Sequence, residues 1–256
     1  MGNELEHIYQ KYLSKKQNDI HYIGESSGVI KLRDIFKTLV PFEHPDAYAM
    51  LDNEVLIFEH FEFDSSNNNK KKGSQQRRSE AEDNRTFATL KPSGNGTLHH
   101  GEIFADYSIE NYKKNLKQAF HKHYSEIAAY KQTLREKGVI TGTERITTLF
   151  FIEDTTVLGN IVEPEYSDRA LEPLVLLFCD FFLDLFECSP DLDMVVCASW
   201  FPNEYCLWYM DQTMILEYRK HEIDTSKVKI VNLNPQSIGV KLIIPDERLF
   251  ERNESV

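Results

Sequence analysis

Residues 41–64 constrain the fold more than any other stretch, because two apolar runs of β-prone residues flank the pair Asp52-Asn53. Short runs of this kind joined by such a pair are typical of a β-hairpin. If Asp52 and Asn53 form the loop, Asp46 lies directly opposite Glu59. Side chains alternate faces along a strand, so both carboxylates would share one face, with Cβ atoms roughly 5 Å apart.

The expected pairing of Asp46 with Glu59 is unfavourable unless a proton or a cation lies between the two charges. Hard divalent ions such as Mg²⁺ are commonly held by carboxylates together with waters. The register therefore predicts a site for Mg²⁺ or Mn²⁺ at Asp46 and Glu59. An alternative stays open, because strand ends that meet solvent often carry acids, and a three-residue loop would move Glu59 to the other face.

The composition is that of an ordinary globular protein. Of the 256 residues, 41% are hydrophobic and 27% are charged, which suits one large domain or two small ones. No uncharged apolar run is long enough for a membrane span, so none is expected. The N-terminus lacks the basic-then-apolar order of a signal peptide, and cytoplasmic residence is the expectation.

The net charge of −12 is unevenly distributed. Residues 65–100 have a net charge of +4, which leaves −16 for the rest of the chain. Few large apolar residues and many Asn, Ser, Lys and Gly in this segment predict a long mobile loop. Its Lys70, Lys71 and Lys72 either guide a phosphate backbone to the carboxylates or belong to a solvated linker.

Helical periodicity predicts amphipathic helices over residues 3–16 and 107–137. Gly138 is expected to end the second helix, and Lys113 and Lys117 belong to its basic side. In both helices the lysines are expected to face outward.

Apolar runs in the remaining chain predict a sheet. A strand at 146–152, an apolar core helix at about 168–188 and a strand at 194–201 indicate a right-handed parallel crossover. Residues 24–40 fit either a strand or a short helix. Further strands are expected at 205–210, 213–223, 228–233 and 240–245.

The order of these elements in the first 155 residues resembles the PD-(D/E)xK nuclease superfamily. The resemblance rests on Pro45-Asp46, on Glu59 at the end of an apolar strand and on the helix over 107–137, and it covers about three-fifths of the chain. It implies an α/β fold with a mixed sheet, in which an α-β-β-β-α-β core is flanked by helices and extended by C-terminal strands. Residues 1–155 would form the core, and residues 156–256 an α/β extension packed on the same sheet.

The sequence departs from this family at Phe61, where the family has a lysine that orients and activates the attacking water. In the expected register His44 lies opposite Phe61, and a histidine there is a candidate general base because its side chain titrates near neutral pH. Otherwise a lysine arrives from elsewhere, from Lys72, Lys113 or Lys117. It is equally open that His44 only packs on Phe61 and that the site has no base.

The resemblance implies a metal-dependent nuclease that hydrolyses phosphodiester bonds of DNA or RNA, with a homodimer as an open possibility. Asp46, Glu59, His44 and Lys72 would then form the catalytic site. The alternative is a catalytically inactive relative, or an acidic binding protein that engages a basic protein partner. The nucleic acid would be bound by Lys70, Lys71, Lys72, Lys113 and Lys117.

Overall fold

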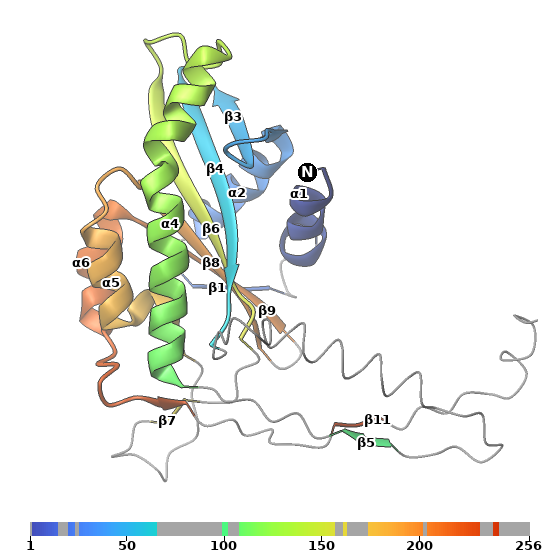
Figure 1. Cartoon of the computed structure of the whole chain (residues 1–256), viewed down its shortest axis with the longest axis vertical. Coiled ribbons are helices and arrows are strands. Elements are labelled where there is room, and N and C mark those ends of the chain that lie inside the picture. Colours follow the sequence, from blue (N-terminus) through green and yellow to red (C-terminus); the bar gives the residue numbers. More distant parts are fainter. Residues whose placement is uncertain are drawn as a thin grey trace, which may run out of the picture.

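The computed structural model describes several stretches of the chain, with a mixed β-sheet at their centre (Figure 1). The described residues are 2–14, 20–23, 26–65, 99–101, 108–156, 161–162, 174–201, 204–230 and 238–240. Nearly all of the expected basic loop lies outside them, and so do its lysines Lys70, Lys71 and Lys72.

The sheet has seven strands in the order β1-β9-β8-β6-β4-β3-β2. β6 runs parallel to both β4 and β8, whereas the pairs β3–β4 and β8–β9 are antiparallel. This arrangement confirms the predicted α/β fold with a mixed sheet. The strands are β1 (Ile20–Ile23), β2 (Val40–Pro41), β3 (Ala47–Leu51), β4 (Glu54–Phe63), β6 (Arg145–Asp154), β8 (Met194–Phe201) and β9 (Glu204–Asp211).

Helices cover both faces of the sheet, with α4 and α5 on one face and α1 and α2 on the other (Figure 1). The succession α2, β2, β3, β4, α4, β6 has an α-β-β-β-α-β order if β5, which lies in a separate ladder, is left aside. Its first helix is α2 and not the helix predicted over residues 3–16, and β8 and β9 extend the sheet. Two short ladders pair β5 (His99–Gly101) with β11 (Ile238–Val240) and β7 (Ile161–Val162) with β10 (Lys229–Ile230). The helices are α1 (Gly2–Ile8), which continues as a π-helical turn (Tyr9–Leu13), α2 (Ser26–Thr38), α4 (Ile109–Glu136), α5 (Asp180–Glu187) and α6 (Ile215–Tyr218).

The β3–β4 hairpin has the predicted register. Leu51 pairs with Glu54, and Ala49 pairs with Leu56, so Asp52 and Asn53 form the loop. Asp52 adopts a φ of 50°, a left-handed conformation that aspartate tolerates better than most residues. The last pair of the ladder is Ala47 with Phe58, so the preceding residue, Asp46, lies just outside it.

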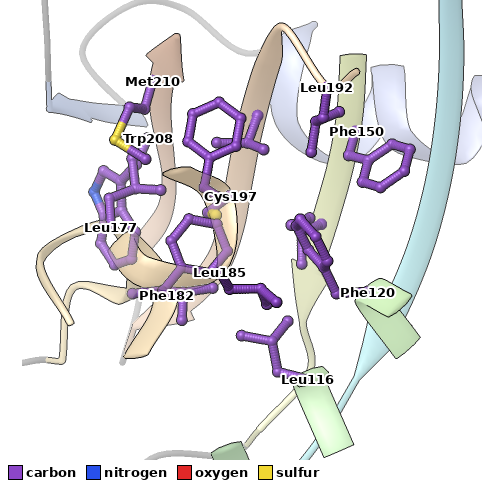
Figure 2. Packing of buried hydrophobic residues seen from close by; sticks show 14 of the residues in the cluster. Leu116, Phe120, Phe150, Leu177, Phe182, Leu185, Leu192, Cys197, Trp208 and Met210 are labelled. Atoms are coloured by element: carbon purple, nitrogen blue, oxygen red, sulfur yellow. The ribbon is translucent and has the colours of Figure 1, made fainter. Parts of the chain in front are cut away.

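The helix α4 packs through an apolar stripe at the predicted spacing. Its N-cap Ser108 accepts a hydrogen bond from a backbone N–H of the first turn at 3.0 Å, and Gly138, with a φ of 72°, follows its C-terminal end. Phe120 of this helix packs against Phe150 of β6 with ring centroids 5.7 Å apart, and Leu116 lies one turn further along the helix (Figure 2). Burial of such side chains stabilises the fold by about 1.5–3 kcal/mol each, which fixes α4 over β4 and β6.

The strand predicted over residues 213–223 is wrong, because this segment is helical. It consists of α6 with one 3₁₀ turn before it and one after it. The Asp211 carboxylate caps the segment by accepting two backbone N–H hydrogen bonds, at 2.9 and 3.2 Å. Ile215 and Tyr218 are buried at helical spacing, so the apolar residues of this segment serve a helix packed near α5.

The other ambiguous segments are also settled. Residues 24–40 contain the helix α2. The apolar helix predicted over 168–188 is shorter within the described residues, where a 3₁₀ turn (Leu176–Phe178) precedes α5. Cys179, between the 3₁₀ turn and α5, has an extended backbone and forms an isolated β-bridge with Ile223. The predicted helix is therefore interrupted at Cys179. Among the described residues, no helix is both long and apolar enough to cross a membrane.

Candidate functional site

Polar residues lie on both faces of β4 near its carboxyl end. Glu59 and Phe61 face α4, because their partners are Tyr130 and His123 of that helix. His60 and Glu62 face the side of α1, where they meet Glu153 of β6. Because side chains alternate between the faces of β4, this one strand contributes to two clusters, one on each face of the sheet.

On the α4 face, Asp46 and Glu59 are in contact, but not as a pair of carboxylates that share a cation. Glu59 is 5% exposed, and its Oε1 accepts a hydrogen bond from Tyr130 Oη at 2.7 Å and lies 2.6 Å from His123 Nδ1. Its Oε2 accepts a hydrogen bond from Asp46 N–H at 3.3 Å. Asp46 Oδ2 accepts one from His60 N–H at 2.7 Å.

Protein donors thus compensate the charges of Asp46 and Glu59, and the argument that only a cation makes their proximity tolerable no longer applies. Among the described residues, the ligand atoms that lie close enough together to hold a metal ion belong to His60, Glu62 and Glu153. The prediction of a divalent ion at Asp46 and Glu59 therefore gains no support from their geometry.

The predicted contact between His44 and Phe61 is replaced by two others. The Phe61 ring stacks on His123 with a centroid distance of 4.7 Å and an interplanar angle of 9°. His44 precedes β3 in a bend, packs edge-on against Tyr130 at 4.6 Å and places Nε2 3.6 Å from Glu126 Oε2. The hairpin register does not extend to His44, so the expected position opposite Phe61 is wrong.

The helix lysines Lys113 and Lys117 belong to the end of α4 where β4 and β6 terminate. Tyr112, beside Lys113, donates a hydrogen bond to Asp154 at 2.7 Å, and Asn115 donates one to the backbone oxygen of Asp64 at 2.9 Å. His123, which contacts Glu59, is about 15 Å along the helix axis from Lys113 and about 9 Å from Lys117, given a rise of about 1.5 Å per residue. Neither lysine therefore replaces the missing lysine beside Glu59.

On the α1 face, His60, Glu62 and Glu153 form a cluster whose ligand atoms all lie within 4.8 Å of one another. Glu62 and Glu153 are directly adjacent in the parallel register of β4 and β6. His60 Nε2 lies 3.5 Å from Glu153 Oε2. Glu153 and His60 are buried, with 1% and 6% exposure, whereas Glu62 is exposed, so the cluster is open to solvent on one side.

Lys11 and Tyr12 complete this cluster from the turn that follows α1. The Lys11 ammonium forms an ion pair with Glu153 Oε1, and Tyr12 Oη donates a hydrogen bond to the same oxygen at 2.8 Å. Lys11 Nζ also lies 5.0 Å from the centroid of the Tyr12 ring and 5.7 Å from that of Tyr205. Lys11 was expected to face outward, and this expectation is wrong because Glu153 draws it inward.

The electrostatics of the cluster keep Glu153 ionised. Burial alone would raise the pKa of this carboxyl, but contacts with His60, Lys11 and Tyr12 outweigh burial and lower the pKa to about 2. Burial, followed by the charge of Glu153, raises the pKa of the Tyr12 hydroxyl, so Tyr12 stays a donor. The cluster thus combines a buried anion, an imidazole, a second carboxylate and a resident ammonium.

The next residue on β6, Asp154, faces α4, and its pKa is raised, whereas that of Glu153 is lowered. Burial raises its pKa to about 6, although hydrogen bonds from Thr156 and Tyr112 act against the shift. Because the folded-state pKa lies above the ordinary 3.8, this group stabilises the fold fully below about pH 3.8. That contribution is lost as the pH rises through about 6.

Asp154→Asn is expected to remove this loss. The wild type should lose about 2 kcal/mol of unfolding free energy from this group between pH 4 and pH 7, whereas the variant should lose little from this position. Urea unfolding at pH 4, 5, 6 and 7 measures the difference. An unchanged pH slope in the variant would contradict the assignment to Asp154.

No family model matches the chain, and no curated protein or solved structure is significantly similar to it. The chemistry of the site therefore rests on its own geometry. That geometry favours the cluster at His60, Glu62 and Glu153 over the predicted pair at Asp46 and Glu59.

Proposed function

We propose that the chain is a metal-dependent nuclease that hydrolyses phosphodiester bonds of DNA or RNA, with its metal centre at His60, Glu62 and Glu153. The observation that carries this proposal is the convergence of these three ligand atoms within 4.8 Å at the carboxyl ends of two parallel strands. One imidazole and two carboxylates form a mixed nitrogen and oxygen ligand set. Carboxylates suit Mg²⁺ and Mn²⁺, and the imidazole favours Mn²⁺ over Mg²⁺.

A bound ion at this cluster would supply a water of lowered pKa and a positive charge for the phosphate. Glu153 would offer Oε2 to the ion, because Oε1 already accepts from Lys11 and Tyr12. Lys11 places an ammonium beside the ligands, and this is the role that the resemblance gives to the motif lysine. His60 would bind through Nε2, the nitrogen that faces Glu153.

Basic side chains at the same end of the sheet support an anionic substrate. Lys113 and Lys117 lie within about one and a half helical turns of Tyr112, whose hydroxyl contacts Asp154, the residue after Glu153. They belong to the opposite face of the sheet from the cluster, so a nucleic-acid backbone would pass around the strand ends to reach both. Lys70, Lys71 and Lys72 were predicted to bind the same substrate, and they lie outside the described residues.

The proposal is tested with Glu62→Gln, because Glu62 is exposed and its replacement should leave the fold intact. Cleavage of single- and double-stranded DNA and RNA with Mn²⁺ is expected to fall by about 100-fold or more, since one of three ligands is weakened. The exposed Glu136→Gln, at the far end of α4, serves as the control and should keep full activity. Equal cleavage by the wild type and Glu62→Gln would contradict the proposal.

A binding protein without catalysis is the second candidate. Phe61 stacked on His123, and Glu59 satisfied by Tyr130, support it, because packing occupies the positions that resemble the nuclease motif. The net charge of −12 would then favour a basic protein partner. Absence of both cleavage and any Mn²⁺-dependent change in melting temperature, together with salt-sensitive binding to a basic protein, would favour this candidate.

A further inference from the structure

The geometry points to Asp46 as a positioning residue for the proposed metal ligand His60, a role that rests on the proposed function. Asp46 Oδ2 accepts the backbone N–H of His60 at 2.7 Å. The contact is charge-assisted, since the acceptor is a carboxylate, and such hydrogen bonds are among the stronger ones in proteins. Asp46 therefore holds the backbone of a proposed ligand residue.

The place of this contact on the sheet explains its effect. Among the described residues, the ladder between β3 and β4 ends where Ala47 pairs with Phe58. Beyond Phe58, β6 continues to pair with β4 on its other side as far as Phe63. The Asp46 carboxylate supplies a hydrogen bond on the open side, at His60, so both edges of β4 are held at the point where the ligands begin.

Asp46 is itself anchored to α4 through a short chain of contacts. Its N–H donates to Glu59 Oε2, and Glu59 Oε1 meets Tyr130 and His123. The Phe61 ring stacks on His123 and limits its movement. A network on the α4 face thus reaches the ligands on the α1 face through the backbone of β4.

The fold offers a matched control for this contact. Asp193 Oδ2 accepts the backbone N–H of Thr148 at 2.7 Å, so the same bond is made to the neighbouring strand β6. Thr148 lies about 16 Å along the strand from Glu153, at about 3.3 Å per residue. Asp193→Ala therefore removes an equivalent hydrogen bond at a distance from the proposed ligands.

Binding of Mn²⁺ alone, measured by calorimetry at a temperature where all variants are folded, provides the test. Asp46→Ala is expected to weaken Mn²⁺ binding by about tenfold, as losses behind metal ligands commonly do, whereas Asp193→Ala should leave it unchanged. Asp46→Asn keeps an oxygen acceptor and loses only the charge, so a weakening of a few-fold at most is expected. Equal effects of Asp46→Ala and Asp193→Ala, including no effect of either, would overturn the positioning role.

A second measurement separates this role from the proposed function. Without metal, the ¹⁵N resonances of the His60 ring are expected to shift in Asp46→Ala and to stay in place in Asp193→Ala. If the wild type binds no Mn²⁺, the proposed metal centre is wrong, but these resonances still decide whether Asp46 holds His60. If Asp46→Ala does not fold, Asp46→Leu, which also lacks an acceptor for the His60 N–H, carries both measurements, and an unshifted His60 ring would overturn the inference.

Discussion

Replacing Glu153 by alanine is expected to lower the free energy of unfolding by about 3 kcal/mol, because it removes one partner of a largely buried ion pair. The Lys11 ammonium and the Tyr12 hydroxyl would lose their shared acceptor, Oε1. The variant is also expected to lose Mn²⁺ binding. Urea unfolding at pH 7 gives the first quantity, and calorimetric titration gives the second.

The milder variant Glu153→Gln isolates the charge of this carboxyl. In the wild type its pKa is lowered from the ordinary 4.5 to about 2, so its contribution is present above about pH 4.5 and is lost as the pH falls towards 2. This loss amounts to about 3 kcal/mol, and Glu153→Gln should remove it from the acid side of the stability profile.

A matched control for the acid profile is Glu144→Gln. The pKa of Glu144 is also lowered to about 2, chiefly by the hydrogen bond from Thr141, but Glu144 is only partly buried, whereas Glu153 is 1% exposed. Solvent screens a group that it can reach, so the replacement of Glu144 should change the acid profile less than Glu153→Gln does. An acid slope that persists in Glu153→Gln and disappears in Glu144→Gln would contradict the assignment.

The core of the fold was predictable because local patterns carry it. The pair Asp52-Asn53 between apolar runs gives the hairpin and its register, and the apolar stripe from Ile109 to Leu134 gives α4. The segment 213–223 was predicted wrongly because its apolar residues fit a strand as well as a short helix. Asp211 caps the start of this helical segment, which favours a helix over a strand. Asp211 can do so only because β9 ends at this residue.

The candidate site was harder to predict because its residues come together only in the folded sheet. From the sequence alone, His60, Glu62 and Asp64 fit either a second acidic cluster or a strand face that meets solvent or basic groups on a helix, and Glu153 only closes its strand. Glu62 and Glu153 become neighbours through the parallel pairing of β4 with β6, which no local pattern reports. The signal that was available is that acids at the carboxyl ends of adjacent parallel strands meet at one edge of the sheet.

The residues that were predicted as ligands illustrate the limit of a register argument. Placing Asp46 beside Glu59 was right at the level of contact, but the strand β3 begins only at Ala47. Outside the ladder, the Asp46 side chain turns to a backbone N–H of β4 and does not lie over the face of the sheet. A one-residue difference in where a strand begins thus turns the side chain of a predicted metal ligand towards the backbone of a neighbouring strand.

Lys11→Met is expected to strengthen Mn²⁺ binding and to weaken cleavage at the same time. The Lys11 ammonium partly neutralises Glu153, so its removal leaves a more negative site, and the Mn²⁺ affinity should rise by about tenfold. The same removal takes away a positive charge beside the proposed position of the phosphate. Loss of one such group commonly lowers the rate of the chemical step by about 10²–10³-fold.

Lys11→Arg is the control, because it keeps a positive charge beside Glu153, and both quantities should stay closer to those of the wild type. Calorimetry gives the affinity, and cleavage at saturating Mn²⁺ gives the rate. If Lys11 served only to attach the turn after α1 to the sheet, its loss would loosen the cluster and weaken binding and cleavage together. Opposite changes of affinity and rate therefore distinguish a resident counter-ion of a metal centre from a structural ion pair.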